Sequence, residues 1–244
     1  MVTSRKTIKG RPMDADPPPL PAEGRARRSA HILETAATLL VRWGFRKTTI
    51  DDVAREAGVA KGTIYLHWKD KNALFLAALM HAHKQANADV MQRIAVDPEG
   101  GLPHRLWTHG MLAALANPLM AAIIKGDTDI FQGLRGAFDP ETLQQLTGDY
   151  EAYIVQLQQA GLIRADLPVS VITFLTSALK IGLINTPDLL GPEQPPSMEQ
   201  LTEALSDLIR RWLEPDSLPR DSAVGKRFVA EWLEKLKEVE EQLQ

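Results

Sequence analysis

The chain has 244 residues, of which 44% are hydrophobic and 24% are charged, and it contains no Cys. This length supports a real core in one large or two small domains, and this composition excludes collagen-like, purely coiled-coil and wholly disordered proteins. The lack of Cys excludes disulfide frameworks, thiolate zinc sites, iron–sulfur clusters and cysteine nucleophiles, and it fits a reducing compartment. The sequence has no run of about 18 apolar residues, which a membrane span needs, and its N-terminus lacks the apolar stretch of a signal peptide. We therefore expect a cytoplasmic protein with no membrane partner.

The net charge of −3 hides an asymmetry between two parts of the chain. Residues 1–71 carry 14 Lys and Arg against 8 Asp and Glu, a net charge of +6, whereas residues 72–244 carry 14 against 23, a net charge of −9. A local cationic face favours contact with a polyanion. A solvated charged surface would give the same counts, so charge alone leaves both interpretations open.

Residues 1–24 contain five prolines between Pro12 and Pro21 and almost no apolar periodicity. Such a segment cannot bury enough surface to offset the entropy lost on ordering, so we expect a disordered arm. Its cationic side chains could enter a minor groove or could simply keep the tail soluble. They are Arg5, Lys6, Lys9 and Arg11.

Four helices are predicted between Arg25 and Ile94. The first has an apolar stripe from Ile32 to Trp43 and stops at Gly44; the second begins after an N-cap at Thr49 and ends at Gly58. The third covers residues 61–68, and the fourth begins with Leu74 and Phe75. Downstream, Gly and Pro punctuation separates helices near 102–116, 118–125, 128–136, 140–160, 168–185, 198–213 and 222–242, with a proline-rich loop over 187–196. The predicted fold class is all-α.

The second and third helices, joined by a tight turn at Gly58, have the outline of a helix-turn-helix whose second helix fits a major groove. The segment is GFRKTTIDDVAREAGVAKGTIYLHWKDK, from Gly44 to Lys71. It resembles the N-terminal signature of the TetR family of transcriptional regulators over Gly44 to Leu74. Ala60 stands where many members have Ser, so a hydroxyl cap of about 1 kcal/mol is missing. A weaker resemblance, in AGLIRADLP from Ala160, is similar to the turn before the family's dimerisation helices.

After the arm at 1–24, the resemblance implies a DNA-binding domain at 25–75 and a helical effector-binding and dimerisation domain at 76–244, with an extra C-terminal helix. Lys61, Gly62 and Thr63 open the recognition helix and are the candidates for reading bases. The other expected DNA contacts are Thr48 and Thr49 at a helix start, Tyr65, Leu66 toward a thymine methyl, His67, and Lys71 toward a phosphate. Arg25, Arg27, Arg28 and Lys47 are diffuse electrostatic candidates.

An apolar effector pocket and a dimer interface are further implications of the resemblance. The candidate pocket residues are Trp107, Met111, Met120, Phe131, Phe138, Tyr150 and Tyr153, although such residues are as often plain core. The candidate dimer residues are Phe174, Leu175, Leu179, Leu205, Leu208 and Trp212, which could instead be buried within one protomer.

No catalytic or metal-binding constellation is predicted, so we expect neither an enzyme nor a cofactor. His81 and His83 are two residues apart and point to different sides of a helix, and Asp127 and Asp129 lack the further ligands of a calcium loop. The predicted function is a homodimeric regulator, a repressor that leaves its operator when a small molecule binds. There are two alternatives. The first is a ligand-independent or activating DNA-binding regulator, and the second is a small-molecule carrier or enzyme that has retained the N-terminal helices.

Overall fold

The computed structural model describes residues 22–125, 130, 140–190, 196–217 and 222–242, and every regular element in these ranges is a helix. The all-α prediction is confirmed. The helices are α1 (Ala22–Lys47), α2 (Ile50–Glu56), α3 (Lys61–Tyr65), α4 (Lys71–Val96), α5 (Pro103–Ala116), α6 (Pro118–Ile124), α8 (Pro140–Gln159), α9 (Val169–Leu190), α10 (Met198–Leu213) and α11 (Ala223–Gln242).

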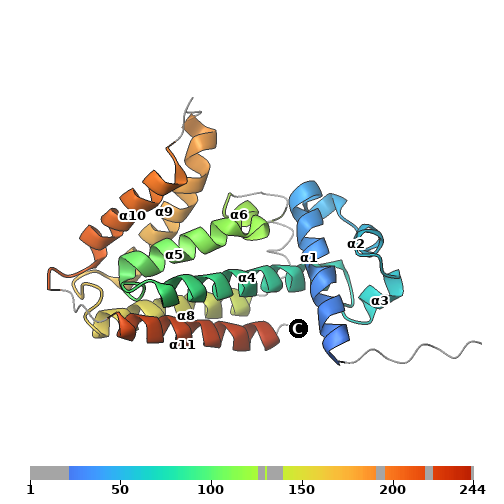
Figure 1. Ribbon diagram of the computed structural model, residues 1–244, viewed down its shortest axis with the longest axis horizontal. Coiled ribbons are helices and arrows are strands. Elements are labelled where there is room, and N and C mark those ends of the chain that lie inside the picture. Colours follow the sequence, from blue (N-terminus) through green and yellow to red (C-terminus); the bar gives the residue numbers. More distant parts are fainter. Residues whose placement is uncertain (1–21, 126–129, 131–139, 191–195, 218–221, 243–244) are drawn as a thin grey trace, which may run out of the picture.

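The long helix α4 connects two parts of the molecule (Figure 1). At one end α1, α2 and α3 form a compact unit; along the rest of α4, α5 lies on one side while α8 and α11 lie on the other. Helices α9 and α10 project away from the long axis (Figure 1), and α10 packs against α5 while α9 contacts α8. We call residues 22–82 the head and residues 83–242 the body.

The head closes over a dense apolar core. Ile32, Ile64, Leu74 and Phe75 are each 0% exposed. Between them pack the apolar stripe of α1 and the inner faces of α2 and α3, as the helical spacing predicts. The same core extends beyond residue 75 along α4 to Ala82 and includes part of α6, so α6 ties the body to the head.

Local signals end the head helices where the sequence predicts. Gly44 has a φ of +81°, which breaks the regular course of α1, and Gly58 has a φ of +66° in the turn after α2. Asp70 caps α4 by accepting a hydrogen bond from the backbone N–H of Ala73 at 2.9 Å. Downstream, Asn117 caps α6 in the same way and marks the bend after α5.

One predicted break is wrong. Helix α9 continues through Pro187 to Leu190, although the sequence predicts an end near residue 185 and a loop from 187. Proline inside a helix lacks the amide donor and its ring crowds the carbonyl four residues earlier, which is why the sequence predicts a break here, and the described contacts around Pro187 do not explain why α9 continues. The helix predicted near 128–136 lies outside the described residues except for Ile130.

The body has a core of its own, formed by α5, α8, α10 and α11 with the ends of α4 and α9. At its far end, the turn between α4 and α5 is tied together by Asp97, whose carboxylate accepts from Arg105 and His109. Burial raises the pKa of Asp97, but the hydrogen bonds from His109 and Arg105 outweigh it, so this pKa lies below its usual value. These hydrogen bonds therefore hold the turn between α4 and α5 in a compact conformation.

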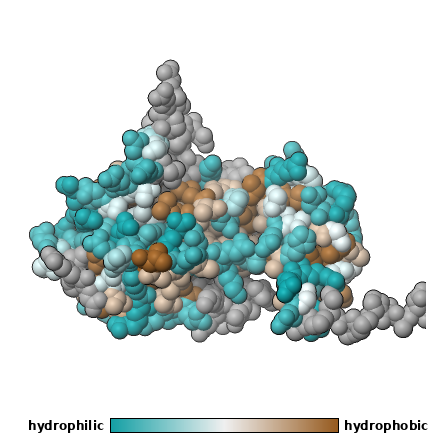
Figure 2. Space-filling view, viewed as in Figure 1, coloured by the Kyte–Doolittle hydropathy of each residue, from teal (hydrophilic) through white to brown (hydrophobic). Residues whose placement is uncertain are grey.

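None of the described helices is long and apolar enough to cross a membrane by itself. Only α5 and α6 taken together reach that threshold of length and hydropathy, and these two helices are bent by 108° relative to each other. Figure 2 shows one face of the molecule as mostly hydrophilic, with apolar residues gathered around α5 and α6.

Candidate nucleic-acid interface

Local hydrogen bonds fix both the start of α2 and the turn that leads from α2 to α3. The Thr49 hydroxyl accepts from the Asp52 backbone N–H, and the Asp52 carboxylate accepts from the Thr49 backbone N–H, which completes a capping box. Hydrogen bonds from the Thr49 and Arg55 side chains lower the pKa of Asp52. Beyond Gly58, the Val59 N–H donates to the Ala54 carbonyl at 3.0 Å and sets the direction in which α3 begins.

Helix α3 presents one face to the core and the other to solvent. Ile64 is 0% exposed and Trp68 is half-buried against the head core, whereas Tyr65 is 48% and Leu66 83% exposed. Because Ile64 fixes the rotation of the helix, the outer side chains point away from the body. Lys61, Gly62 and His67 share that exposed face, and Thr63 lies at its border. The structure thus brings together most of the residues that the sequence predicts to read DNA.

Gly62 has no structural reason to be glycine. Its backbone is helical, and a Cβ built on it would meet no atom within 4 Å. Helix interiors normally disfavour glycine by about 1 kcal/mol relative to alanine. The predicted absence of a cap is confirmed as well, since Ala60 at the N-cap makes no side-chain hydrogen bond. The start of α3 therefore has an open, unobstructed backbone.

Lys61 has a partner that the sequence did not reveal. Its Nζ lies 2.9 Å from Oδ2 of Asp51 at the start of α2, and this hydrogen bond raises the pKa of Lys61. Both side chains are exposed. The ammonium group is thereby held between the two short helices, although their ten-residue separation gives no sequence signal for the pairing.

Thr48 occupies a structural position, which corrects the expectation that it meets a phosphate. Its side chain is 0% exposed. Its hydroxyl can donate a hydrogen bond to the Gly44 carbonyl at 2.8 Å or to the Leu39 carbonyl at 3.2 Å. Thr49 is exposed and remains at the surface. Lys71 donates to the Arg46 carbonyl at 3.3 Å and lies 4.7 Å from the ring centroid of Phe45.

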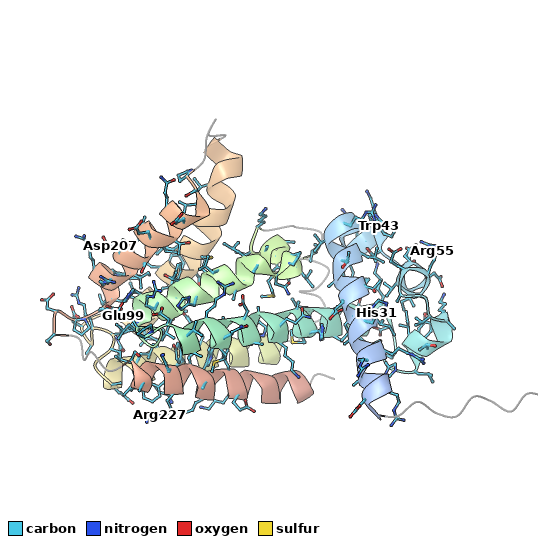
Figure 3. All side chains as sticks on the ribbon, viewed as in Figure 1. His31, Trp43, Arg55, Glu99, Asp207 and Arg227 are labelled. Atoms are coloured by element: carbon cyan, nitrogen blue, oxygen red, sulfur yellow. The ribbon has the colours of Figure 1, made fainter. Side chains whose placement is uncertain are left out.

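Three exposed cationic side chains of the head lie at the end of α1, on α2 and in the segment that follows α3. The side chains of Lys47, Arg55 and Lys69 are exposed, and Figure 3 shows Arg55 on the side of the head that faces away from the body. Sequence reasoning missed Arg55 and Lys69. A single exposed charge has no distinguishing pattern in the sequence, since most such charges are simply solvated.

In the body, five of the seven predicted pocket residues line one cavity of about 340 Å³, while Phe131 and Phe138 lie outside the described residues. The five are Trp107, Met111, Met120, Tyr150 and Tyr153. They come from α5, α6 and α8, so the fold gathers side chains that are up to 46 residues apart in the chain.

The predicted dimer residues divide into three groups. Phe174, Leu175 and Leu208 are 72%, 41% and 47% exposed, so they offer apolar surface on α9 and α10. Leu179 and Trp212 are half-buried against the body core. Leu205 is only 6% exposed within the protomer and already belongs to its core, because it points inward from α10.

The comparisons with known proteins agree with this arrangement. The family model described as "Bacterial regulatory proteins, tetR family" matches residues 32–78, which contain α2, α3 and the start of α4. A TetR-family structure from Rhodococcus sp. superposes with a TM-score of 0.60 and 25% identity over 78% of this chain and 100% of that chain. Residues 32–78 are a TetR-type DNA-binding domain, and the chain has the fold of a TetR-family structure over most of its length.

Two curated relatives show how the similarity is distributed along the chain. An HTH-type transcriptional regulator of Bacillus subtilis is 43% identical over 51 residues, which cover 21% of this chain and 18% of the relative. An HTH-type transcriptional repressor of Mycobacterium tuberculosis is 26% identical over 193 residues, 76% of this chain and 95% of the relative. The chain spans only 18% to 36% of the length of the first three curated relatives that it matches.

The matched family is one of transcriptional regulators rather than enzymes. Among the described residues there is no group of three or more His, Asp or Glu placed to hold a metal ion. His81 instead lies 3.4 Å from Glu34, and His83 faces the body cavity.

Proposed function

We propose that this TetR-family regulator is a repressor that binds a roughly palindromic duplex as a homodimer and leaves it when a small molecule occupies the body. The outer face of α3 is the observation that carries the DNA-binding part. A groove-reading helix must expose polar and small residues while its other side anchors it, and α3 does so around Ile64. Two relatives, from Mycobacterium tuberculosis and Rhodococcus jostii, are named as repressors.

Gly62 supports the proposal because the fold does not require it. A backbone without a Cβ can approach a base edge or a phosphate closely, which gives the glycine a purpose outside the protein. Lys61 and Thr63 beside it supply the side chains for base contacts. To reach a base, Lys61 must leave Asp51, so this ion pair holds the ammonium near its target and is exchanged on binding.

The dimer rests on the exposed apolar side chains of α9 and α10. Phe174, 72% exposed, is a large aromatic surface for a monomer to leave in water, and a second copy would cover it. In such a dimer, two α3 helices placed about 34–36 Å apart would enter successive major grooves on one side of a duplex. Effector release follows by linkage, since a ligand that favours another spacing lowers the affinity for the operator.

The test is binding of purified protein to duplexes enriched from a random pool, measured by fluorescence anisotropy at several salt concentrations. We expect salt-sensitive binding with two protomers per site by sedimentation. Gly62→Ala should fold normally and bind at least tenfold more weakly, because the methyl group obstructs close approach to the groove. Lys61→Ala and Thr63→Ala should lower the preference for the selected sequence by about 1–3 kcal/mol per lost base contact.

Controls separate this surface from general charge effects. Tyr65→Ala and Lys71→Ala should weaken binding to every duplex alike, as expected for backbone contacts. Lys235→Ala removes the same charge from an exposed position on α11 and should change little. Unchanged affinity in all the α3 variants, or no salt-sensitive binding to any duplex, would remove the assigned surface.

A further inference from the structure

The body cavity is walled by aromatic rings from three helices. Trp107 comes from α5, Tyr150 and Tyr153 from α8, and Trp232 from α11. The Tyr153 and Trp232 rings are stacked, with centroids 5.2 Å apart and planes at 22°, and Tyr150 lies 5.9 Å from Trp232 at 56°. The remaining walls are mostly aliphatic. A ring inserted here would continue the offset and edge contacts that these side chains already make.

The cavity is uncharged as far as the described residues line it. They include no Asp, Glu, Lys or Arg, and the polar groups are His83, Asn87, Thr176, the two tyrosine hydroxyls and the indole N–H groups of Trp107 and Trp232. Burial raises the pKa of Tyr150 and of Tyr153, so both phenols remain protonated. Burying a charged ligand without an opposite charge is costly, which selects against carboxylates and phosphates. The His83 imidazole lies 3.4 Å from the Asn87 amide, so these two side chains form the polar corner of the cavity.

The C-terminal helix α11 forms one wall through Val229, Trp232 and Leu233. Its first turn is fastened to the α4–α5 turn: the Ser222 hydroxyl donates to the Pro98 carbonyl at 2.6 Å, and Lys226 donates to the Asp97 carbonyl at 2.7 Å. Further along, the Trp232 indole N–H has no acceptor among the described residues, so stacking rather than a hydrogen bond positions the ring.

The backbones of Gly101 and Gly225 approach so closely that only glycine fits at either position. A Cβ on Gly225 would lie 1.8 Å from the Gly101 carbonyl oxygen. Helix α11 is thus pinned at the turn that ends α4, and α4 continues from this turn to the head (Figure 1). A ligand that presses on Trp232 acts on a helix coupled directly to α4.

From this arrangement we propose that the cavity binds a small, uncharged, ring-containing compound that packs against Tyr150, Tyr153 and Trp232, with α11 forming one wall of the site. The proposal rests on the proposed function and specifies the chemical class of its effector. A volume of about 340 Å³ is at the lower end for ligand pockets, so the compound is small. An aliphatic chain would gain apolar burial but no ring contacts.

The test compares matched probes by titration calorimetry in the absence of DNA. Indole, 2-naphthol and coumarin are uncharged ring compounds; indole-3-acetate, 2-naphthoate and coumarin-3-carboxylate are their respective anionic counterparts, and decanol is an uncharged chain. We expect at least one uncharged ring compound to bind and to bind at least tenfold more tightly than its anion and than decanol. Preference for the anions or for decanol, or no binding of any ring compound, overturns the proposal.

Variants of α11 make the test specific to this wall. Trp232→Ala should lower the affinity for the ring compound about tenfold, Trp232→Phe should retain most of it, and Trp43→Phe, on α1 of the head, should leave it unchanged. Circular dichroism and duplex binding check that each variant is folded. An affinity unchanged in Trp232→Ala would contradict the role of α11.

A duplex-binding measurement with the ring compound present distinguishes this proposal from the proposed function. If the compound binds but the protein stays on the duplex, the proposed chemical class of the ligand is supported and the proposed release by an effector is contradicted. If ring compounds do not bind while another class of molecule releases the protein from the duplex, the proposed ligand class is wrong and the proposed function as a ligand-controlled regulator is supported.

Discussion

The head and the body of this molecule are both helical and both have an apolar core, yet they are packed in opposite ways. In the head, the described buried polar side chains are the threonines Thr35 and Thr48, and the apolar side chains close on one another. In the body, the buried polar side chains include His104, His109 and Glu214, and the core surrounds a cavity of about 340 Å³. A surface that must match a rigid groove needs a closed core, whereas a site for a small molecule needs space.

The largest expected effect comes from breaking the buried polar network of the body. Glu214 accepts hydrogen bonds from the backbone N–H of His104 at 3.0 Å and from its Nδ1 at 2.7 Å, while Arg210 donates to Nε2 at 3.0 Å. Glu214→Ala leaves these donors unpaired in the interior and should lower the free energy of unfolding by about 3–5 kcal/mol. Urea denaturation measures it.

The matched control for that substitution is Glu199→Ala, at an exposed position in the first turn of α10. It should change the free energy of unfolding by less than about 0.5 kcal/mol. A loss below about 1 kcal/mol for Glu214→Ala would mean that the network does not hold α5 to α10.

The contrast in packing predicts different responses to the same enlargement. Ala36 is 0% exposed in the head core, so Ala36→Leu should overpack it and cost about 1–3 kcal/mol. Ala114 lines the body cavity, where the added atoms enter existing space, so Ala114→Leu should cost less than about 1 kcal/mol. Thermal unfolding of the two variants compares them directly. Equal losses would show that the body is packed as tightly as the head.

A smaller effect on stability is expected at the N-termini of α2 and α3, the two helices of the helix-turn-helix. Thr49 caps α2 with its hydroxyl, whereas Ala60 leaves α3 without a side-chain cap. Thr49→Ala should therefore destabilise the head by about 1 kcal/mol, and Ala60→Ser should stabilise it by a similar or smaller amount. Denaturant midpoints test both signs. Destabilisation by Ala60→Ser would indicate that the start of α3 must remain uncapped.

Short-range sequence patterns are enough to predict most of the head. The capping residues Thr49 and Asp52, the left-handed Gly58 and the apolar spacing around Ile64 act within a few residues of one another, so the sequence alone predicts α2, the turn and the outer face of α3. Thr48 escapes this reasoning. Whether a hydroxyl faces solvent or the Gly44 and Leu39 carbonyls depends on how the end of α1 folds back.

The body is less accessible to sequence reasoning because its decisive contacts join distant residues. Glu214 stands in a segment that the sequence predicts as a connecting loop, yet it pairs with His104, 110 residues earlier. Trp232 is one apolar residue of a predicted C-terminal helix, and only the packing of α11 against α8 places it beside Tyr153. The spacing of apolar residues along a helix indicates that a side chain is buried but not which side chain it meets.

The amino-acid sequence by itself determined the all-α class, the positions of most helix ends and the presence of the helix-turn-helix. Capping, glycine conformation and 3.6-residue periodicity, on which these features depend, are short-range effects. Only the tertiary structure decided which polar groups became buried partners and where the body left a cavity. Those outcomes depend on long-range packing, in which each side chain takes the neighbours that the remaining helices bring to it.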